Sequence, residues 1–395
     1  MKILVLNCGS SSLKYQLIDM EEKQVLAKGN YERIGEKESF LTHKVGPQKY
    51  VIKKIALTHK EALNEIINSL LSKEFNTISN LNEIDAVGHR VVHGGEIFKK
   101  SCLIDKQVIE DIGKCSVFAP LHNPAAIQGI NACEELMPGT PMVAVFDTAF
   151  HQTMPKQNYM YPIPKQYYEK YGIRKYGAHG TSHKYVATRL AEIMNKNIED
   201  LKIVTCHLGQ GASISAIEGG KSLDTSMGLT PLGGIPMVTR SGDLDPSVIT
   251  YIMDKENINP KAMEDILNKK SGLAAVADLS PDFRYIEEMS FSNLDAKNAI
   301  DMFVSKVAEY IARYAAKMQG IDAIVFTGGI GENQINVRKS ICERLEFMLV
   351  NIDEEKNNVK SVETEISKEE SKVKVYLIPT DEELMIAQDT LSLVI

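Results

Sequence analysis

The sequence predicts an α/β protein built from two halves that open in the same way. An apolar strand over residues 3–6 leads into a run of small polar residues, Asn7–Lys14, and then into a second strand. The same order of strand, small-residue loop and strand begins again at residue 201. Further along, residues 301–319 have the apolar spacing of a helix, and a short apolar strand over 321–326 follows. Helices alternating with buried strands are typical of the α/β class.

The run Asn7–Lys14, NCGSSSLK, has the composition of a phosphate-binding loop. Glycine and serine allow backbone N–H groups to approach an anion closely, the hydroxyls add donors, and Lys14 supplies a positive charge. Turns of this composition also serve as plain hairpin connections, so the residues leave that alternative open.

Two charged residues stand at the ends of predicted strands in the first half. Arg90 closes a strand that begins near Ile84, and Asp147 follows the apolar strand 141–146. Ligands of α/β proteins gather at the carboxyl ends of strands, so both side chains are candidates for a binding site. The plainer readings are a surface arginine and an aspartate that caps a turn.

Two histidines precede predicted helices, whose N-termini favour anions. Asn123 is the expected N-cap and Pro124 the first residue of a helix that would place His122 at its positive end. His179 likewise precedes a helix that Thr181 or Ser182 would cap. A neighbour of a helix cap with no further role is the plainer reading of each.

The second half carries its own glycine-rich segments. The strand 201–206 runs into HLGQGAS, residues 207–213, and the strand 321–326 runs into TGGIGEN, residues 327–333. Three glycines within four positions of the latter indicate that a base or ribose lies against bare backbone. The triplet Gly220–Ser222 resembles the end of a Walker P-loop, but serine occupies the position of that motif's first glycine, which excludes a Walker-type NTPase. Arg240 lies in a loop too polar for a core.

Composition predicts a cytoplasmic enzyme of two domains, 1–150 and 151–382. The chain has 395 residues and a net charge of -7, which argues against non-specific nucleic-acid binding. No apolar run reaches membrane-spanning length. The six cysteines lack CxxC pairing and are expected to be reduced packing residues.

Several of these segments together resemble the acetate kinase family. They are Ile3–Lys14, HLGQGAS, GTSH, TRSGDLDP, FTGGIGEN and TDEELMIAQDT, which are spread over nearly the entire chain. The resemblance implies two duplicated RNase H-like domains with a nucleotide cleft between them, as in the superfamily of acetate and sugar kinases, Hsp70 and actin. It also implies that a C-terminal helix, about 383–395, returns to the first domain.

The resemblance implies a reaction and a set of residues for it. The reaction is the reversible, Mg²⁺-dependent transfer of the γ-phosphoryl group of ATP to acetate in a cytoplasmic homodimer, with no nucleic-acid or membrane partner. The implied metal ligands are Asn7 and Glu382, with Glu383 as the alternative to Glu382 and Mn²⁺ as an alternative ion. The implied catalytic residues are Asp147, His179 and Arg240, and the implied substrate-binding residues are Arg90, His122 and Ala178. The implied contacts to ATP or ADP are Lys14, His207, Leu208, Gly209, Gln210, Gly211, Asp282, Phe283, Arg284, Gly329, Ile330, Gly331, Glu332 and Asn333.

Two positions depart from the common pattern of that family. Gln210 replaces an asparagine and keeps its amide one methylene further out. Ala178 replaces a phenylalanine that lines the methyl pocket, so propionate or a broader range of short-chain acids is the alternative substrate. A non-catalytic ATP-binding protein of the actin or Hsp70 type is the distant alternative, but it would not need Arg90, Asp147 and Arg240.

Overall fold

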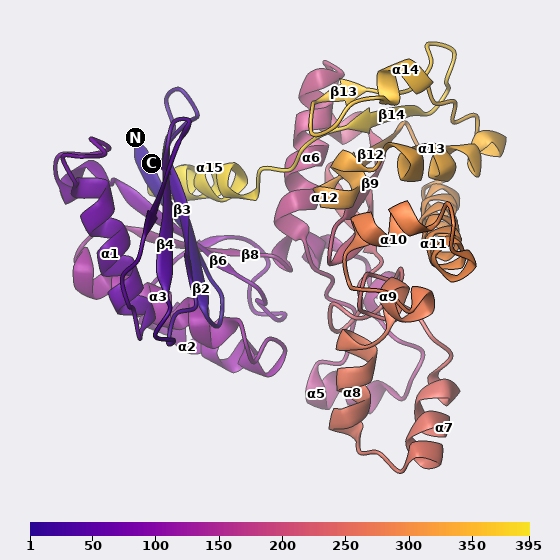
Figure 1. The fold of residues 1–395 in the computed structure, drawn as a ribbon, viewed down its shortest axis with the longest axis horizontal. Coiled ribbons are helices and arrows are strands. Elements are labelled where there is room, and N and C mark those ends of the chain that lie inside the picture. The colour runs from indigo at the N-terminus through magenta and orange to yellow at the C-terminus, as the bar shows by residue number, and fades with distance from the viewer. The chain divides into compact units, whose positions relative to one another are not determined.

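The computed structural model describes all 395 residues, which divide into two compact units: residues 1–150 with 381–395, and residues 151–380. Figure 1 shows the chain coloured from its N-terminus to its C-terminus. Both ends of the chain belong to the first unit. The structure contains no helix whose length and apolar character would suit it to crossing a bilayer.

The first unit is a mixed sheet with helices on both faces. Its strand order is β5-β4-β3-β2-β1-β6-β8-β7, in which β1, β6 and β8 are parallel neighbours and β1 to β5 pair antiparallel. Its strands are β1 (Lys2–Cys8), β2 (Ser12–Asp19), β3 (Gln24–Glu32), β4 (Phe40–Val45), β5 (Gln48–Ile52), β6 (Ala86–Val91), β7 (Cys102–Leu103) and β8 (Met142–Phe146). Its helices are α1 (His59–Leu71), α2 (Lys106–Lys114), α3 (Asn123–Leu136) and α15 (Glu382–Val394).

The central strand β1 is apolar on both faces because helices cover each of them. Leu4 and Leu6 belong to the cluster under α1 and α3, whereas Ile3 and Val5 belong to the cluster under α15. A near-continuous apolar run is what such a doubly covered strand requires. At Gly88 of β6 a Cβ atom would stand 2.5 Å from Thr390 Oγ1 and 2.7 Å from Ile386 Cγ2, so glycine allows the close approach of α15.

The second unit repeats the core of the first sheet. Its strand order is β11-β10-β9-β12-β14-β13, and β9, β12 and β14 are the parallel members. Its strands are β9 (Lys202–Leu208), β10 (Ala212–Glu218), β11 (Lys221–Thr225), β12 (Ala323–Thr327), β13 (Thr364–Glu365) and β14 (Lys374–Leu377). The order 11-10-9-12-14 matches 3-2-1-6-8 of the first unit, which confirms the predicted duplication.

The helices of the second unit include one long member, α11 (Leu294–Met318), which supplies much of the apolar core. The others are α4 (Lys156–Tyr159), α5 (Lys165–Tyr171), α6 (Gly180–Ile193), α7 (Pro246–Glu256), α8 (Pro260–Lys269), α9 (Gly272–Ala277), α10 (Phe283–Met289), α12 (Gly328–Asn333), α13 (Ile335–Glu343) and α14 (Glu354–Asn357). The cysteines of both units are free thiols, and all of them except the partly exposed Cys102 are buried, as expected for reduced packing residues.

Local structure differs from the sequence-based expectation at three of the motifs. Asn7 and Lys14 lie within β1 and β2 and pair with each other across the ladder, so the loop itself is reduced to residues 9–11. The segment after β12 is the short helix α12 and not a loop. His122, not Asn123, is the N-cap of α3, because the Asn123 side chain is buried and binds backbone groups of His93 and Ile112 instead.

Candidate active site

In the first unit, Arg90 and Asp147 form a bidentate ion pair at the carboxyl ends of β6 and β8. Arg90 Nε donates to Asp147 Oδ1 at 3.1 Å, and Nη2 donates to Oδ2 at 2.5 Å. The third guanidinium nitrogen, Nη1, donates to Asn7 Oδ1 at the end of β1, at 3.3 Å. The Asp147 side chain is 3% exposed and that of Arg90 21%, so the carboxylate is the buried partner that holds the arginine. Parallel strands β1, β6 and β8 therefore deliver three of the predicted residues to one place.

Two glutamates at the start of α15 complete this cluster. Glu382 Oε2 lies 3.9 Å from Arg90 Nε. Burial raises the pKa of Glu382 to about 7; Arg90 opposes the rise, and the carboxylates of Asp147 and Glu383 add to it. A proton or a cation at this point relieves the repulsion among the carboxylates.

The oxygen donors of the first unit suit a magnesium ion bound mainly through its substrate. No group of three or more His, Cys, Asp or Glu side chains is arranged as a complete metal site. Mg²⁺ is commonly held by one or two carboxylates together with substrate phosphates and water. The Asn7 amide oxygen and the crowded Glu382 carboxylate are donors of the right kind. Glu383 lies in the first turn of α15 beside Glu382 and lines a separate surface pocket with Lys14.

His122 and Lys14 are the other predicted residues of the first unit. His122 is exposed at the N-terminus of α3. Lys14 is exposed on β2, next to Asn7 in the strand register.

In the second unit, His179 and Arg240 converge on Gly211. A Cβ atom on this glycine would lie 3.4 Å from His179 Nε2 and 3.6 Å from Arg240 Nη1. His179 is the N-cap of α6 and has a positive φ of 56°, a left-handed backbone conformation that is uncommon for residues other than glycine. Two predicted catalytic side chains and the predicted phosphate loop thus meet at one point.

Arg240 has no carboxylate partner. Its Nη1 donates to the Pro231 carbonyl at 3.0 Å and to Met237 Sδ at 3.8 Å. Burial lowers the pKa of Arg240, but a guanidinium stays protonated at neutral pH. A half-buried cation whose charge is not neutralised by the protein is a suitable partner for the oxygens of a phosphoryl group.

A chain of hydrogen bonds runs from His179 into the core. His179 Nδ1 lies 2.8 Å from Ser213 Oγ, and the same oxygen lies 2.8 Å from His183 Nε2. His183 Nδ1 is in turn 2.7 Å from Thr205 Oγ1. Burial lowers the pKa of His183 well below its usual value, so this imidazole is neutral.

The Ser213 hydroxyl has a single proton, so it can donate to one histidine and must accept from the other. If the Thr205 hydroxyl donates to His183, then His183 Nε2–H donates to Ser213, and Ser213 donates to His179 Nδ1. This order leaves the proton of a neutral His179 on Nε2, the nitrogen that faces Gly211. Sequence reasoning missed Ser213, because β10 is buried from Ala212 to Ile217 and no alternation of burial sets this serine apart from its neighbours.

Removal of the Ser213 hydroxyl should slow turnover without weakening substrate binding equally. We expect Ser213→Ala to lower kcat about 10-fold, since a positioning hydrogen bond of about 1.4 kcal/mol is lost, with a small change in KM. Ser215→Ala is the matched control: Ser215 is also buried on β10, but it bonds to Ser222 and to the Asp224 carbonyl. Steady-state kinetics on both variants make the comparison, and equal losses would remove the role assigned to Ser213.

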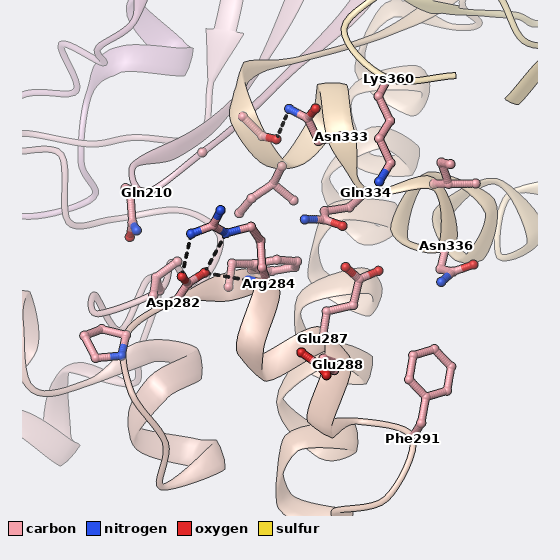
Figure 2. A pocket seen from close by; sticks show the side chains of 17 residues that line it. Gln210, Asp282, Arg284, Glu287, Glu288, Phe291, Asn333, Gln334, Asn336 and Lys360 are labelled. Atoms are coloured by element: carbon pink, nitrogen blue, oxygen red, sulfur yellow. Dashed lines mark hydrogen bonds and ion pairs between the residues drawn. The ribbon is translucent and has the colours of Figure 1, made fainter. Parts of the chain in front are cut away.

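A cavity of about 960 Å³ in the second unit gathers eight of the fourteen predicted nucleotide contacts (Figure 2). It is lined by Gly209 and Gln210 after β9, by Asp282–Arg284 at the start of α10 and by Gly329, Ile330 and Asn333 of α12. Sequence reasoning did not find Glu287, Phe291 or Lys360, which also line it. These residues come from a helix and a loop whose composition is ordinary for a protein surface, so the sequence carried no signal for them.

Arg284 is one of the residues that line the cavity, and Figure 2 shows its guanidinium group bonded to Asp282. Its Nε and Nη2 lie 3.1 and 2.7 Å from the two carboxylate oxygens, and Asp282 also caps α10 by accepting from the Arg284 backbone N–H. A flat guanidinium of this kind can stack on a planar ring or bind an anion.

The glycines at the start of α12 differ in whether a side chain would fit at their positions. Gly328 has φ of +75°, and its Cβ would lie 2.7 Å from the Leu208 carbonyl oxygen, so only glycine joins β12 to α12 here. Gly329 lines the cavity and has open space where a Cβ would point. Glu332 accepts from the Gly328 backbone N–H at 3.0 Å, which indicates a structural part for that carboxylate.

Ala178 is buried in the core cluster that includes Met227, Ile235 and Met237. Its carbonyl oxygen lies 2.9 Å from His151 Nε2. The ring of His207 is stacked on that of His179 at a centroid distance of 4.2 Å. His207 Nδ1 bonds to Ser182 Oγ at 2.8 Å, so this histidine is fixed by α6.

Comparison with known proteins supports one family over the whole chain. The model of the acetokinase family matches residues 2–388. Acetate kinase of Thermoanaerobacter pseudethanolicus is 57% identical over 397 residues, which cover 100% of this chain and 99% of that protein. Acetate kinase of Clostridium acetobutylicum is 54% identical, again over 100% and 99% of the two chains.

Solved structures of similar proteins have the same fold. The crystal structure of Porphyromonas gingivalis acetate kinase has a TM-score of 0.97 at 45% identity and covers 100% of both chains. A propionate kinase from Francisella tularensis has a TM-score of 0.92 at 44% identity over 99% of each chain. These likenesses confirm the two duplicated α/β domains predicted from the sequence.

Proposed function

The chain belongs to the acetokinase family, and we propose that it catalyses the reversible transfer of the γ-phosphoryl group of ATP to acetate, which yields acetyl phosphate and ADP. It is accordingly an enzyme, a phosphotransferase with a carboxyl group as acceptor. The observation that carries the proposal is the meeting of Arg240, a cation without a carboxylate partner, with His179 at Gly211.

The charges of the reaction match the side chains of the second unit. Phosphoryl transfer passes through a loose state whose negative charge is spread over three equatorial oxygens. The Arg240 guanidinium and the Nε2–H of His179 are donors for those oxygens, and the residues of the 960 Å³ cavity hold the rest of the nucleotide. His207 and Gly209–Gly211 would lie along the phosphates.

The first unit supplies the acceptor site in this proposal. Arg90, oriented by Asp147, binds the acetate carboxylate through guanidinium N–H groups. Acetate is already ionised at neutral pH, so the nucleophile has no proton to lose and a general base is unnecessary in this direction. We therefore assign to Asp147 the orientation of Arg90 and not proton transfer. His122 is proposed as a further phosphate contact and Lys14 as a contact to ATP.

Asn7 and Glu382 would hold the Mg²⁺ ion. A divalent ion bridging phosphate oxygens neutralises charge that develops on them. The Glu382 carboxyl, whose pKa is raised to about 7 by burial, loses its proton more readily when a cation is bound near it. Mn²⁺ has the same preference for oxygen ligands and should substitute. A cytoplasmic homodimer stays a prediction from the family resemblance.

One assay tests the proposed reaction. The enzyme is incubated with ATP, Mg²⁺ and acetate, propionate or butyrate, and acyl phosphate is trapped with hydroxylamine as the hydroxamate. We expect acetyl hydroxamate in amounts that follow ADP release. ADP release without hydroxamate would refute acyl transfer and favour an ATP-hydrolysing protein.

The size of residue 178 bears on the choice between acetate and propionate, since the similar structures include a propionate kinase. If Ala178 leaves space beside the acyl methyl group, propionate buries one more methylene there, worth about 1 kcal/mol and so several-fold in kcat/KM. Ala178→Phe should then reduce kcat/KM for propionate several-fold more than that for acetate.

Burial of Ala178 in the core gives this test a control. A phenyl ring forced into a filled core would lower stability by about 1–3 kcal/mol, so the thermal midpoint is measured beside the kinetics. An unchanged ratio of the two kcat/KM values, in a variant that folds, would mean that residue 178 does not select the acyl chain.

A further inference from the structure

The face of the first sheet that carries Asn7 and Arg90 continues outward over strands β2 to β5. Residues that pair directly across neighbouring strands point to the same face. Asn7 pairs with Lys14, which pairs with Asn30 and then Thr42, while the next row runs Val5, Gln16, Lys28, Lys44 and Lys49. The alternate residues of these strands, such as Leu13, Tyr31 and Leu41, are buried on the opposite face under α1.

Helix α15 covers only part of this face. The apolar cluster beneath it draws residues from β1, β2, β3, β6 and β8 and none from β4 or β5. The uncovered part is hollowed into a cavity of about 290 Å³. Its lining contains four lysines, the polar side chains of Gln16, Asn30 and Thr42, and the carboxylates of Glu32 and Glu383. The four lysines are Lys14, Lys28, Lys44 and Lys49.

The positions of these lysines destabilise the sheet, and no contact within the protein explains why they are there. Lys28 stands directly opposite Lys44, and Lys44 directly opposite Lys49. Like charges directly opposite each other destabilise a sheet. The side chains of all four lysines are exposed, and none of them takes part in an ion pair or a side-chain hydrogen bond. By contrast, Lys2, Lys54 and Lys60 of the same unit are each paired with a glutamate. In a chain of net charge -7, this is a local concentration of unneutralised positive charge.

We propose that this hollow, the lysine hollow of Lys14, Lys28, Lys44 and Lys49, binds a compact polyanion with two or more phosphate or carboxylate groups. Adjacent strands are about 4.8 Å apart, so ammonium groups on successive strands match anionic groups separated by about 5–10 Å. A single carboxylate such as acetate can engage only one or two of the lysines. The surrounding amide and hydroxyl side chains add hydrogen bonds to the ligand.

Two residues that line the hollow are direct neighbours of residues in the candidate active site. Lys14 pairs with Asn7 in the β1–β2 ladder, and Glu383 follows Glu382 at the start of α15. An anion held by the lysines repels Glu383 and attracts Lys14. It therefore changes the electrostatic potential around Asn7 and Glu382. Occupancy of the hollow should therefore change the rate of the enzyme, although Lys28, Lys44 and Lys49 have no part in the reaction itself.

Binding is measured by calorimetry with two probes, inorganic pyrophosphate and the tricarboxylate tricarballylate, in the absence of divalent ions. The double variant Lys44→Gln/Lys49→Gln removes two charges from the hollow. Lys99→Gln/Lys100→Gln is the matched control, because it removes two exposed lysines of the same unit that form no ion pair. We expect the hollow variant to bind at least 10-fold more weakly, while the control binds like the wild type.

Affinity in the wild type should fall as salt is raised, because the site is exposed to solvent. Binding of pyrophosphate alone would identify the natural ligand as a phosphate compound, and binding of the tricarboxylate alone would identify it as a carboxylic acid. Either result supports the site.

Without ligand, the hollow variant should have a melting temperature equal to or above that of the wild type, since a repulsion between lysines is relieved. Equal affinities in the two double variants, or no binding of either probe to the wild type, would overturn the proposal.

Discussion

Replacement of Arg240 by alanine should lower kcat about 10²-fold or more and change the KM for acetate only modestly. Its guanidinium is half-buried and bonds to a carbonyl and a sulfur atom, so no carboxylate of the protein uses its charge. A cation of this kind is most strongly engaged when negative charge spreads over the transferred phosphoryl group. An interaction made mainly in the transition state is lost from kcat and from kcat/KM together.

The comparison with Arg90 separates the two arginines by function. Arg90→Ala removes the proposed carboxylate-binding group, so the KM for acetate should rise in addition to any loss of kcat. Arg313→Ala is the matched control, because Arg313 is an exposed arginine of the second unit that lies over the Tyr310 ring. Steady-state kinetics with varied acetate, with circular dichroism to verify folding, distinguish the three. Near-wild-type turnover of folded Arg240→Ala would exclude its proposed role.

The fold was predictable because its signals are local. Central strands such as β1 are short apolar runs between turn residues, and α11 has a sustained helical period. The repeat of strand, turn and strand at the start of each half predicted the duplication that the two sheet orders confirm. Ends of elements were less predictable: β1 and β2 extend through Asn7 and Lys14 because the ladder between them continues to Cys8 and Leu13.

The sequence singled out residues for the candidate site, but it did not predict how they are arranged. Arg90 and Asp147 each stood out at a strand end, but 57 positions separate them, and only the parallel pairing of β6 with β8 turns them into an ion pair. Ser213 gave no signal of its own, because a buried serine is informative only when its partners are known. His179 and Arg240 meet at Gly211 through tertiary packing that no local period encodes.

The ion pair of Arg90 with Asp147 makes the Asp147→Asn variant informative. Both carboxylate oxygens of Asp147 accept from Arg90, so an amide of the same shape loses the charge and turns an NH₂ group toward one guanidinium N–H. The Arg90 guanidinium then loses its hydrogen-bonded counter-ion and keeps only Glu382, at 3.9 Å, which is unfavourable for a partly buried charge. We expect kcat/KM for acetate to fall about 10²-fold, with a rise in KM, because Arg90 is no longer held in its binding orientation.

A double-mutant cycle with Arg90→Ala distinguishes the roles open to Asp147. If Asp147 acts by orienting Arg90, the loss in Asp147→Asn largely disappears once Arg90 is absent, so the two losses are far from additive. A role in binding the metal predicts instead that the losses add and that higher Mg²⁺ partly restores the activity of Asp147→Asn. A general base predicts a loss that neither Mg²⁺ nor Arg90 affects. Since acetate has no proton to give up and both Asp147 oxygens already accept from Arg90, the non-additive result is the one that the geometry favours.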